Sequence, residues 1–593
     1  MGREVIAPAT SKRNLDRFSG LREHEKQPNR TRLDQPTPEI AMKDSRHSLL
    51  LALAVAGLLE QGAAGQDSAE DAGGDPARLF WDARNAEHLF NRAGFGASAR
   101  TIVRSLEQGA ESVVDELIEG EGWVVEPFYA RLRGGMESRE RLKRLPDDMR
   151  EEARRRMRRE EAAQVRDFLG WWTERMLSGQ DDLRERMTLF WHGHFTSSMQ
   201  DVKNSHEMIL QNQLLRQNAL GNFGDLVHAI ARDPAMLEYL DNDSNRKARP
   251  NENFARELME LFTIGEGHYT EEDIKEAARA FTGWSDRFGK FRFSRRHHDA
   301  GEKTVLGITG HHDGDDVIDI LLQQESCTRY IAGKLLTYFE GVQPDEERLS
   351  KYAGLLREFD LEIAPFLKRL FLDPDFYREE VVGGRIASPI DFLVGAARRL
   401  SLDPPARLVL AGAASLGEKL FYPPNVKGWD GGETWITTGS LMQRGNLAGV
   451  LLGRVELTHF LNHDPLEGQD VVLNQSQRKR SPAEIKRLRR TLGVLRDLKE
   501  VERAGWRPRM NFSGRLKADG VVGDRDIVRA LCDALLAIEV DDETHRALTG
   551  VWIAMREEQE LQEHDLWSSP KTAEDQLRTL AHVILSLPEA QLN

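Results

Sequence analysis

The chain has 593 residues, a formal net charge of −15, and 40% hydrophobic and 30% charged residues. This length exceeds what one hydrophobic core normally serves, so we expect two or three packed units. The composition is that of a soluble globular protein. The negative charge excludes a general nucleic-acid binder, whose binding face would be basic. It favours cationic ions or partners instead.

The number and spacing of the cysteines exclude further classes of protein. The only two cysteines, Cys327 and Cys532, lie far apart in the sequence. This excludes a disulfide scaffold and a thiolate metal cluster. One long-range disulfide and two buried free thiols both remain open.

The first 78 residues divide into three segments. Residues 1–41 are polar and lack apolar periodicity, so we interpret them as a non-native or disordered prefix, with translation beginning at Met42. Residues 42–65 read as a signal peptide, with a basic start, an apolar run of 11 residues from Leu49 to Leu59, and small residues ending at Gly65. That run is too short to span a bilayer. We expect cleavage near Gly65, a linker at 66–78, and a secreted or periplasmic protein whose mature chain has no transmembrane segment.

Residues 79–465 form the predicted main helical domain. Its first helices are expected at Ser98–Gln108, at Ala110–Ile118, at Ser138–Met176 with an interruption near Pro146, and at Asp225–Leu240 with a break at Pro234. The third contains the run RRRMRREE, which invites a nucleic-acid interpretation. Glu and Asp are interspersed with its arginines, however, and this pattern favours an ordinary solvated helix face.

A helix opened by Pro250 and Asn251 follows, and Gly265 is placed to end it. Within it Phe254, Leu258 and Leu261 recur at helical spacing and predict its buried stripe. Thr270 with Asp273 predicts the capped start of the next helix, which ends near Gly283.

The remaining elements are mostly helical. We expect a short strand or hairpin at Phe288–Phe293, a loop at Gly301–Gly314, and helices at Val317–Leu322, Thr328–Phe339, Glu346–Glu358, Ile363–Leu372 and Pro389–Leu400. A loop rich in Gly and Trp at Pro423–Thr438 follows, then a polar insert or linker at 466–520 and a helical C-terminal region at 521–593. The predicted fold is mainly α: a multi-helix globular body with few short strands.

The first candidate site is His192-Gly193-His194. Two histidines two residues apart share a side only on extended backbone, because on a helix they diverge by about 200°. Gly193 can end a helix and allow them to converge. His206 and Asp241 would then complete the ligand set of a divalent metal such as zinc. The alternative is two histidines hydrogen-bonded inside an aromatic core.

Two polar clusters follow. Asp241, Asp243 and Asn245 resemble the start of a calcium loop, but Arg246 stands where that loop needs glycine, so an EF-hand is excluded. A non-standard oxygen-ligand site at Asp241, Asn242 and Asn253 remains open.

Further along, Asn253, Glu257 and Glu260 share one helix side beside Arg256. Two carboxylates on one face can act as an acid/base pair. An Arg–Glu network tying this helix to its neighbours, for example to Arg279, is the alternative.

Five ordered stretches carry a family resemblance: AEHLFNRAGFG, FWHGHFTSS, the segment from Leu237 to Trp284, HDAGEKTVLG with GDDVIDILL, and PPNVKGWDGGETWI. Together they resemble the bacterial domain-of-unknown-function 1800 family. The resemblance implies a mostly helical secreted protein of bacteria such as planctomycetes, often encoded beside a sulfatase-like family. It carries over no catalytic residues.

We therefore interpret the chain as a secreted protein with one polar site and as a metal- or His/carboxylate-dependent hydrolase of an extracellular polymer such as a polysaccharide. The candidate catalytic residues are His192, His194, Glu257 and Asp241. The candidate substrate-binding residues are Asn251, Asn253, Arg256, Trp284, Trp429 and Trp435. The alternative is a non-catalytic binding or assembly partner of a sulfatase-like exported protein. We further expect His192 or His194 to lie beside Asp241, Asn253 or Glu257.

Overall fold

The structure is a computed structural model that describes residues 79–120, 142, 144–202, 204–287, 289–457, 494, 496–561 and 567–593. The predicted prefix, signal peptide and linker, and residues 466–493 of the predicted insert, lie outside this part of the chain. Among the described residues helices predominate, and the strands form two small two-stranded sheets, so the mainly α prediction is confirmed.

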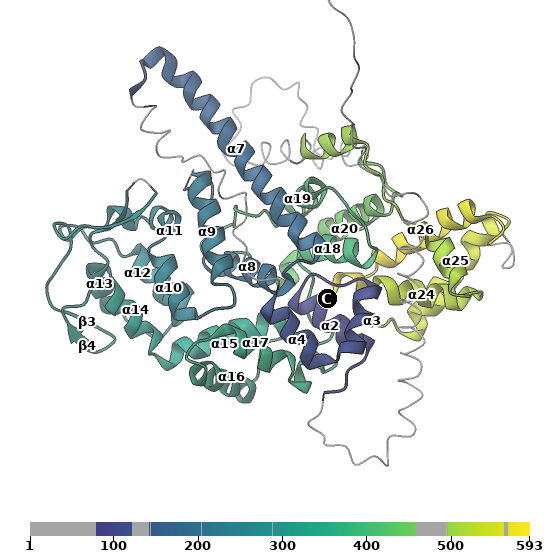
Figure 1. The fold of residues 1–593 in the computed structure, drawn as a ribbon, viewed down its shortest axis with the longest axis horizontal. Coiled ribbons are helices and arrows are strands. Elements are labelled where there is room, and N and C mark those ends of the chain that lie inside the picture. The colour runs from purple at the N-terminus through teal and green to yellow at the C-terminus, as the bar shows by residue number, and fades with distance from the viewer. Residues whose placement is uncertain are drawn as a thin grey trace, which may run out of the picture. The chain divides into compact units, whose positions relative to one another are not determined.

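A first hydrophobic core gathers helices from the N-terminal two thirds of the chain (Figure 1). Each helix turns one apolar stripe inward: Ile363, Phe366, Leu367 and Leu370, at helical spacing, are all fully buried. The helices are α2 (Ala83–Ala93), α3 (Ala99–Gln108), α4 (Ala110–Glu119), α10 (Phe223–Ala231), α11 (Pro234–Tyr239), α12 (Asn253–Glu257), α13 (Glu271–Ala280), α14 (Gly314–Leu322), α15 (Glu325–Glu340), α16 (Glu346–Glu358) and α17 (Ile363–Phe371).

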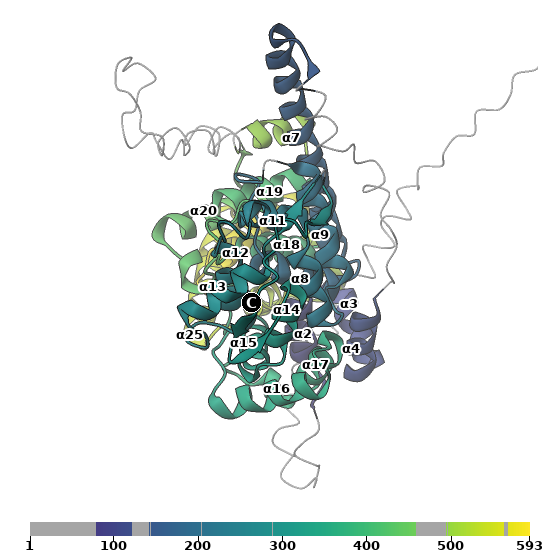
Figure 2. The ribbon, with the colours of Figure 1, turned by 90° about the vertical axis from the view of Figure 1, so that its left-hand side faces the viewer.

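A second hydrophobic core joins one long early helix to the C-terminal helices. The predicted C-terminal helical region therefore shares its core with the body of the protein. These helices are α7 (Asp147–Ser178), α18 (Pro389–Arg399), α19 (Ala406–Ser415), α20 (Thr438–Leu451), α23 (Phe512–Ala518), α24 (Asp524–Leu535), α25 (Asp542–Glu558) and α26 (Pro570–Leu585). In both ribbon views α7 extends past the helices that pack on its C-terminal half (Figures 1 and 2).

Three of the described helices contribute to both cores, among them α11, which gives Met236 to the first core and Ala235 to the second. Helix α8 (Asp182–His194) gives Trp191 to the first core and Leu189 to the second, and α9 (Ser205–Gln217) gives Leu215 to the first and Ile209 to the second. Short turns of other helix types complete the fold: η2 (Asn242–Ser244), η3 (Leu258–Thr263), η4 (Pro374–Tyr377), η5 (Gly432–Trp435) and η7 (Glu589–Gln591).

The strands form two antiparallel hairpins. The hairpin expected near Phe288–Phe293 is present as β1 (Trp284–Asp286) paired with β2 (Phe291–Phe293). The loop prediction at Gly301–Gly314 is wrong in part, because β3 (Lys303–Val305) pairs there with β4 (Ile308–Gly310). The turn residues Leu306 and Gly307 both have positive φ, as a tight two-residue hairpin turn requires. Leucine gives no such signal in the sequence.

Several predicted helix boundaries agree with the structure. Thr270 and Asp273 form the predicted capping box of α13, and Ser98 caps α3. The long charged helix begins at Asp147, and the part of it predicted before residue 142 lies outside the described residues. Cys327 in α15 and Cys532 in α24 are buried free thiols. No helix in the described residues has the length and apolar character needed to cross a membrane.

Candidate functional site

Helix α8 carries both predicted histidines, and Gly193 does not interrupt it. The two rings therefore diverge, as they must on continuous helix. His192 faces Trp172 and Phe421 of the second core, whereas His194 faces Phe195 and Phe262 of the first. The structure thus does not bring the two imidazoles together as joint ligands.

His192 is 1% exposed and surrounded by aromatic rings. Its Nε2 accepts a hydrogen bond from the backbone N–H of Phe421 at 3.2 Å, and the Trp172 and Trp429 rings both lie 5.7 Å from it, centroid to centroid. Burial lowers its pKa to about 4. His192 is therefore a neutral hydrogen-bond acceptor within an aromatic core.

His194 has polar partners on both ring nitrogens. Its Nε2 lies 3.1 Å from the carbonyl oxygen of Phe262, and because a carbonyl only accepts, Nε2 carries the hydrogen. Nδ1 is then the acceptor that faces Nζ of Lys334 at 3.4 Å. Burial and the Lys334 charge hold the pKa of His194 well below its usual value. A neutral imidazole thus receives a hydrogen bond from a lysine.

Lys334 comes from α15, where it follows the buried Ile331 and precedes the buried Leu335. Its Nζ also lies 4.9 Å from the centroid of the Tyr330 ring. Burial, and secondarily the charge of Lys427, lowers the pKa of Lys334 to about 8. The ammonium of Lys334 therefore loses its proton about 2.5 pH units below the usual value for lysine, near pH 8.

The helix that faces His194 and Lys334 changes type in its last turns. Helix α12 runs directly into the π-helix η3, whose end is closed by a hydrogen bond from Ile264 N–H to the Met259 carbonyl at 3.0 Å. The Phe262 carbonyl accepts a hydrogen bond from the His194 ring, and the Leu261 carbonyl accepts one from the Tyr330 hydroxyl at 3.0 Å. π-turns are rare and frequent at functional sites. Here η3 aims two backbone acceptors at side chains of α8 and α15.

The carboxylates of this helix differ in their partners. Glu260 accepts a hydrogen bond from the Tyr269 hydroxyl at 2.9 Å. Glu257 is half-buried, and within the described residues it has no hydrogen-bond or ion-pair partner. Burial, and then the neighbouring Glu260, raises the pKa of Glu257, while Arg256 and Lys427 act in the opposite direction. Glu257 therefore combines partial exposure with a perturbed pKa.

The loop of residues 423–436 packs over the end of α8. Gly428 has φ +87°, and a Cβ atom there would stand 2.4 Å from the Gly193 carbonyl oxygen, so this contact needs glycine at position 428. The Thr196 hydroxyl donates to the Val426 carbonyl. These contacts place Lys427 next to the carboxylates, with its Nζ 3.6 Å from Glu266. Lys427 influences the pKa values of both Glu257 and Lys334, so its charge lies between the carboxylates and the lysine.

Further buried ion pairs anchor α8. The fully buried Arg186 guanidinium donates to Asp391 at 2.5 Å and to the Gly94 carbonyl at 2.8 Å. Through Arg186 the stretch AEHLFNRAGFG contacts α8, so four of the five family-like stretches meet around this helix. We call His194, Tyr330, Lys334, Glu257, Glu260 and Lys427 the His194 site.

The Asp241–Asn253 segment is a network of amide hydrogen bonds. Asn245 donates to Asn242 and to the Ala278 carbonyl, and its own side-chain oxygen accepts from the Asn251 backbone. The side chains of Asn251 and Asn253 donate to the carbonyls of Asp241 and Leu240. These amides hold the turn before α12. In the described residues neither His192 nor His194 is hydrogen-bonded to Asp241, Asn253 or Glu257.

The other predicted residues lie elsewhere. Arg256 forms two 2.8 Å bonds with Glu271 of α13, while Arg279 pairs with Glu276 and Asp299. Trp284 is 2% exposed, so its ring cannot offer a face to a polysaccharide. Trp429 packs against His192, Trp435 is half-buried near Gly417, and His206 is half-buried at the start of α9.

No group of three or more His, Cys, Asp or Glu side chains in the described part of the chain is arranged to hold a metal ion. The predicted set of His192, His194, His206 and Asp241 is accordingly not assembled there. Three members of the His194 site, Tyr330, Lys334 and Lys427, were missed from the sequence. A lysine inside the apolar run YIAGKLLTYF is the signal that could have identified Lys334.

This fold and site define a mainly α-helical protein with two hydrophobic cores and a polar site at the end of a helix shared by both. The family model described as "Protein of unknown function (DUF1800)" matches residues 88–592, and the chain belongs to this family. No curated protein and no solved structure matches the chain.

Proposed function

We propose that the protein is a hydrolase and that Glu257 and Lys334 of the His194 site transfer the protons. The observation that carries the proposal is a half-buried carboxylate, without a hydrogen-bond or ion-pair partner among the described residues, whose pKa responds to the same Lys427 charge as the pKa of a lysine that is hydrogen-bonded to a buried histidine. Perturbed acid and base groups that gather in one place are typical of active sites.

The protonation states suit this chemistry at neutral pH. Glu257 is ionised above its raised pKa and, as a stronger base than an ordinary carboxylate, activates a water molecule. Lys334 is protonated below about pH 8 and donates a proton to the leaving group. His194 is a positioning residue, because its Nδ1 accepts from Nζ of Lys334 and its Nε2 is fixed on the Phe262 carbonyl.

The substrate class is an extracellular polymer such as a polysaccharide. Support for it comes from the signal-like segment at 42–65 and from the family resemblance, and the half-exposed position of Glu257 suits a substrate that approaches from outside.

The test measures hydrolysis of p-nitrophenyl glycosides and p-nitrophenyl esters as a function of pH. We expect a bell-shaped kcat/KM profile that rises through the pKa of Glu257 and falls above about pH 8. Glu257→Gln should remove the acid limb and Lys334→Met the alkaline limb, each with a loss of about 100-fold or more. Glu260→Gln is the matched control: it should shift the acid limb to lower pH without abolishing turnover. Profiles unchanged by Glu257→Gln and Lys334→Met, or no turnover of any substrate, would contradict the proposal.

A non-catalytic assembly role is the second candidate. Helix α20 begins directly after the 423–436 loop and exposes Met442 at 69% and Leu441 at 38%. Exposed apolar neighbours of this kind suit a protein partner such as a sulfatase-like exported protein. Under this alternative Met442→Asp abolishes co-elution with that partner in gel filtration, whereas Glu257→Gln leaves it intact.

A further inference from the structure

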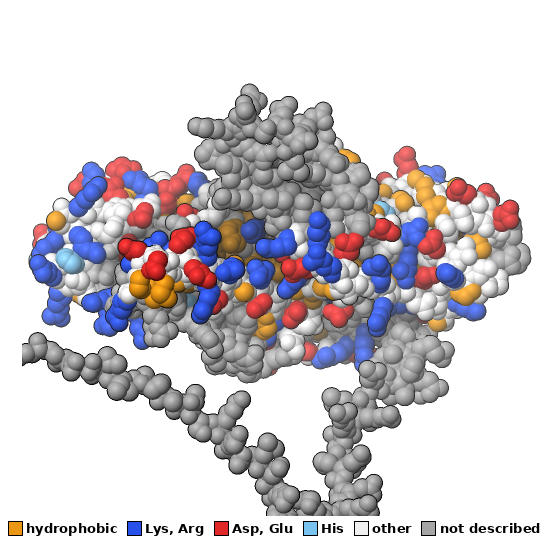
Figure 3. All heavy atoms as spheres, turned by 90° about the horizontal axis from the view of Figure 1, so that it is seen from above, with side chains coloured by type: hydrophobic (Ala, Val, Ile, Leu, Met, Phe, Trp, Pro, Cys, Tyr) orange, Lys and Arg blue, Asp and Glu red, His pale blue; other side chains and the backbone are white. Residues whose placement is uncertain are grey.

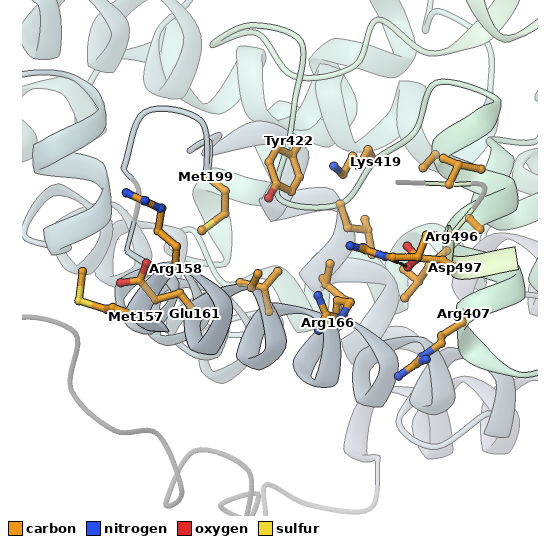
Figure 4. A pocket seen from close by; sticks show the side chains of 18 of the residues that line it. Met157, Arg158, Glu161, Arg166, Met199, Arg407, Lys419, Tyr422, Arg496 and Asp497 are labelled. Carbon is orange, nitrogen blue, oxygen red and sulfur yellow. Dashed lines mark hydrogen bonds and ion pairs between the residues drawn. The ribbon is translucent and has the colours of Figure 1, made fainter. Parts of the chain in front are cut away.

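A separate cavity of about 930 Å³ lies along α7, away from the residues of the His194 site. Its walls come from α7, from α19 and from the turn Lys419–Tyr422 that follows α19. Figure 4 shows Arg158, Glu161 and Arg166 projecting from one helix, with Met199 and Tyr422 across from them. The size is within the range of about 300–1,000 Å³ typical of ligand pockets.

The floor of the cavity is aliphatic. It is formed on one side by α7 and on the other by α19 and the residue after Lys419, with side chains of Val165, Leu169, Leu410, Ala411, Ala414 and Leu420. Val165, Leu169 and Ala411 also belong to the second hydrophobic core. Such a surface binds an alkyl chain by removing it from water. It offers a polar polymer few hydrogen-bonding groups.

The rim of the cavity is basic. Seven Lys and Arg residues line it against three Asp and Glu residues, although the whole chain carries −15. The side chains of Arg154 and Arg166 are exposed, and among the described residues neither is engaged in a hydrogen bond or ion pair. Figure 3, which looks down on the side where α7 extends, shows Lys and Arg side chains around a hollow in which hydrophobic side chains are visible. One guanidinium group can bind two oxygens of a carboxylate or phosphate through two parallel hydrogen bonds.

We propose that this cavity binds an anionic amphiphile: a single molecule whose alkyl chain lies on the aliphatic floor and whose carboxylate, phosphate or sulfate headgroup is bound by one guanidinium of the rim, Arg154 at one end or Arg166 about 18 Å further along α7. The geometry distinguishes this ligand from an acidic oligosaccharide, which would use the rim and leave the floor in contact with water. It also differs from a membrane surface, because the aliphatic groups line a cavity instead of an exposed face. The inference is independent of the proposed hydrolase activity.

The test is calorimetric titration of the full chain with sodium decanoate and sodium dodecanoate, below their micelle concentrations and at an ionic strength of about 0.15 M, where the Debye length is about 8 Å. Two added methylenes should tighten Kd by about tenfold. Arg154→Gln/Arg166→Gln should weaken binding by about tenfold or more, as loss of charged hydrogen bonds does. Arg155→Gln/Arg159→Gln removes the same charge from the same helix outside the cavity, and it should change Kd by less than about twofold at this distance from the ligand.

A second variant tests the floor without changing charge. Ala414→Phe, on α19, places a ring in the cavity and should abolish decanoate binding, with folding checked by circular dichroism. Decyltrimethylammonium and inorganic phosphate, each with half of the required chemistry, should not bind. Decanoate binding unaffected by both the Arg154/Arg166 and the Ala414 variants would overturn the proposal. So would the absence of decanoate binding, whether or not anionic phosphatidylglycerol vesicles or a sulfated oligosaccharide bind in its place.

Discussion

Two effects act in opposite directions on the pKa of Lys334. Burial of its ammonium lowers this pKa, and the hydrogen bond to the neutral His194 imidazole raises it. Burial outweighs the hydrogen bond, and the pKa falls from 10.5 to about 8. Between these two pH values the unfolded chain binds a proton at Lys334 and the folded protein does not. Stability therefore rises with pH across this window.

We predict that Lys334→Met removes this pH dependence. Below about pH 8 the variant should gain stability relative to the native protein, by at most about 3 kcal/mol, and this difference should shrink as the pH approaches 10.5. Urea unfolding at pH 7, 9 and 10.5 measures it. Lys275→Met, at an exposed lysine, is the control and should show no such trend. A Lys334→Met variant whose stability parallels the native curve would show that Lys334 is not desolvated.

His192 gives a second prediction at this scale. His192→Leu leaves the buried N–H of Phe421 without an acceptor and should cost about 1–3 kcal/mol beyond any packing loss. His192→Gln, whose amide oxygen can reach the same N–H, should recover part of that loss. Equal destabilisation by both variants in thermal unfolding would mean that ring packing, not the hydrogen bond, matters at this position.

Single residues were predictable where the surroundings are local in sequence. The buried stripe of Phe254, Leu258 and Leu261 follows from helical spacing and is confirmed. That the partners of His194 would be a backbone carbonyl 68 residues away and a lysine 140 residues away could not be read from spacing, because tertiary packing decides it.

The 423–436 loop shows how an element is fixed by close backbone approach. Gly428 and Gly431 both have positive φ, but a Cβ at Gly428 would meet the Gly193 carbonyl at 2.4 Å, whereas nothing lies within 4 Å at Gly431.

We therefore predict unequal effects of the two alanine substitutions. Gly431→Ala should cost about 1–2 kcal/mol from backbone strain alone. Gly428→Ala adds a clash with backbone and should cost clearly more, while also lifting Lys427 away from Glu257. Denaturant unfolding ranks the two, and the pH at which Glu257 titrates by NMR should rise only in Gly428→Ala. Equal stability of the two variants would show that the loop does not pack against the Gly193 carbonyl of α8.

The helix pair α12–η3 carries another element-scale prediction. Leu258→Ala removes a side chain that is 1% exposed and should cost about 2–5 kcal/mol. Glu257→Gln keeps the volume and removes a partly desolvated charge, so it should be neutral or slightly stabilising near neutral pH. If both variants unfold the protein equally, Glu257 is structural. The helix itself followed from Pro250 and Gly265, but its π-turn did not, because ordinary side chains carry no mark of i→i+5 bonding.

At the scale of the molecule, the mainly α class was predictable from periodicity, whereas the two or three packed units expected from the length stay a prediction. The pairing of α7 with the C-terminal helices was not, because amphipathic stripes define a buried face without naming its partner. The length of the chain alone would favour two units that unfold separately.

Helix α8 has the opposite consequence for folding. Glu185 pairs with Arg175 of α7 and Arg216 of α9, and Arg186 pairs with Asp391 of α18; of these side chains only that of Arg175 is partly exposed. If one core melted alone, charged groups of α8 would lose their counter-ions. Each broken pair would cost about 3–5 kcal/mol of free energy. Loss of one core therefore removes the other.

We expect a single calorimetric transition whose van't Hoff and calorimetric enthalpies agree. Arg186→Met should lower that transition without splitting it. Two resolved transitions would show that the cores melt independently. A helix that two cores share thus makes them one cooperative unit.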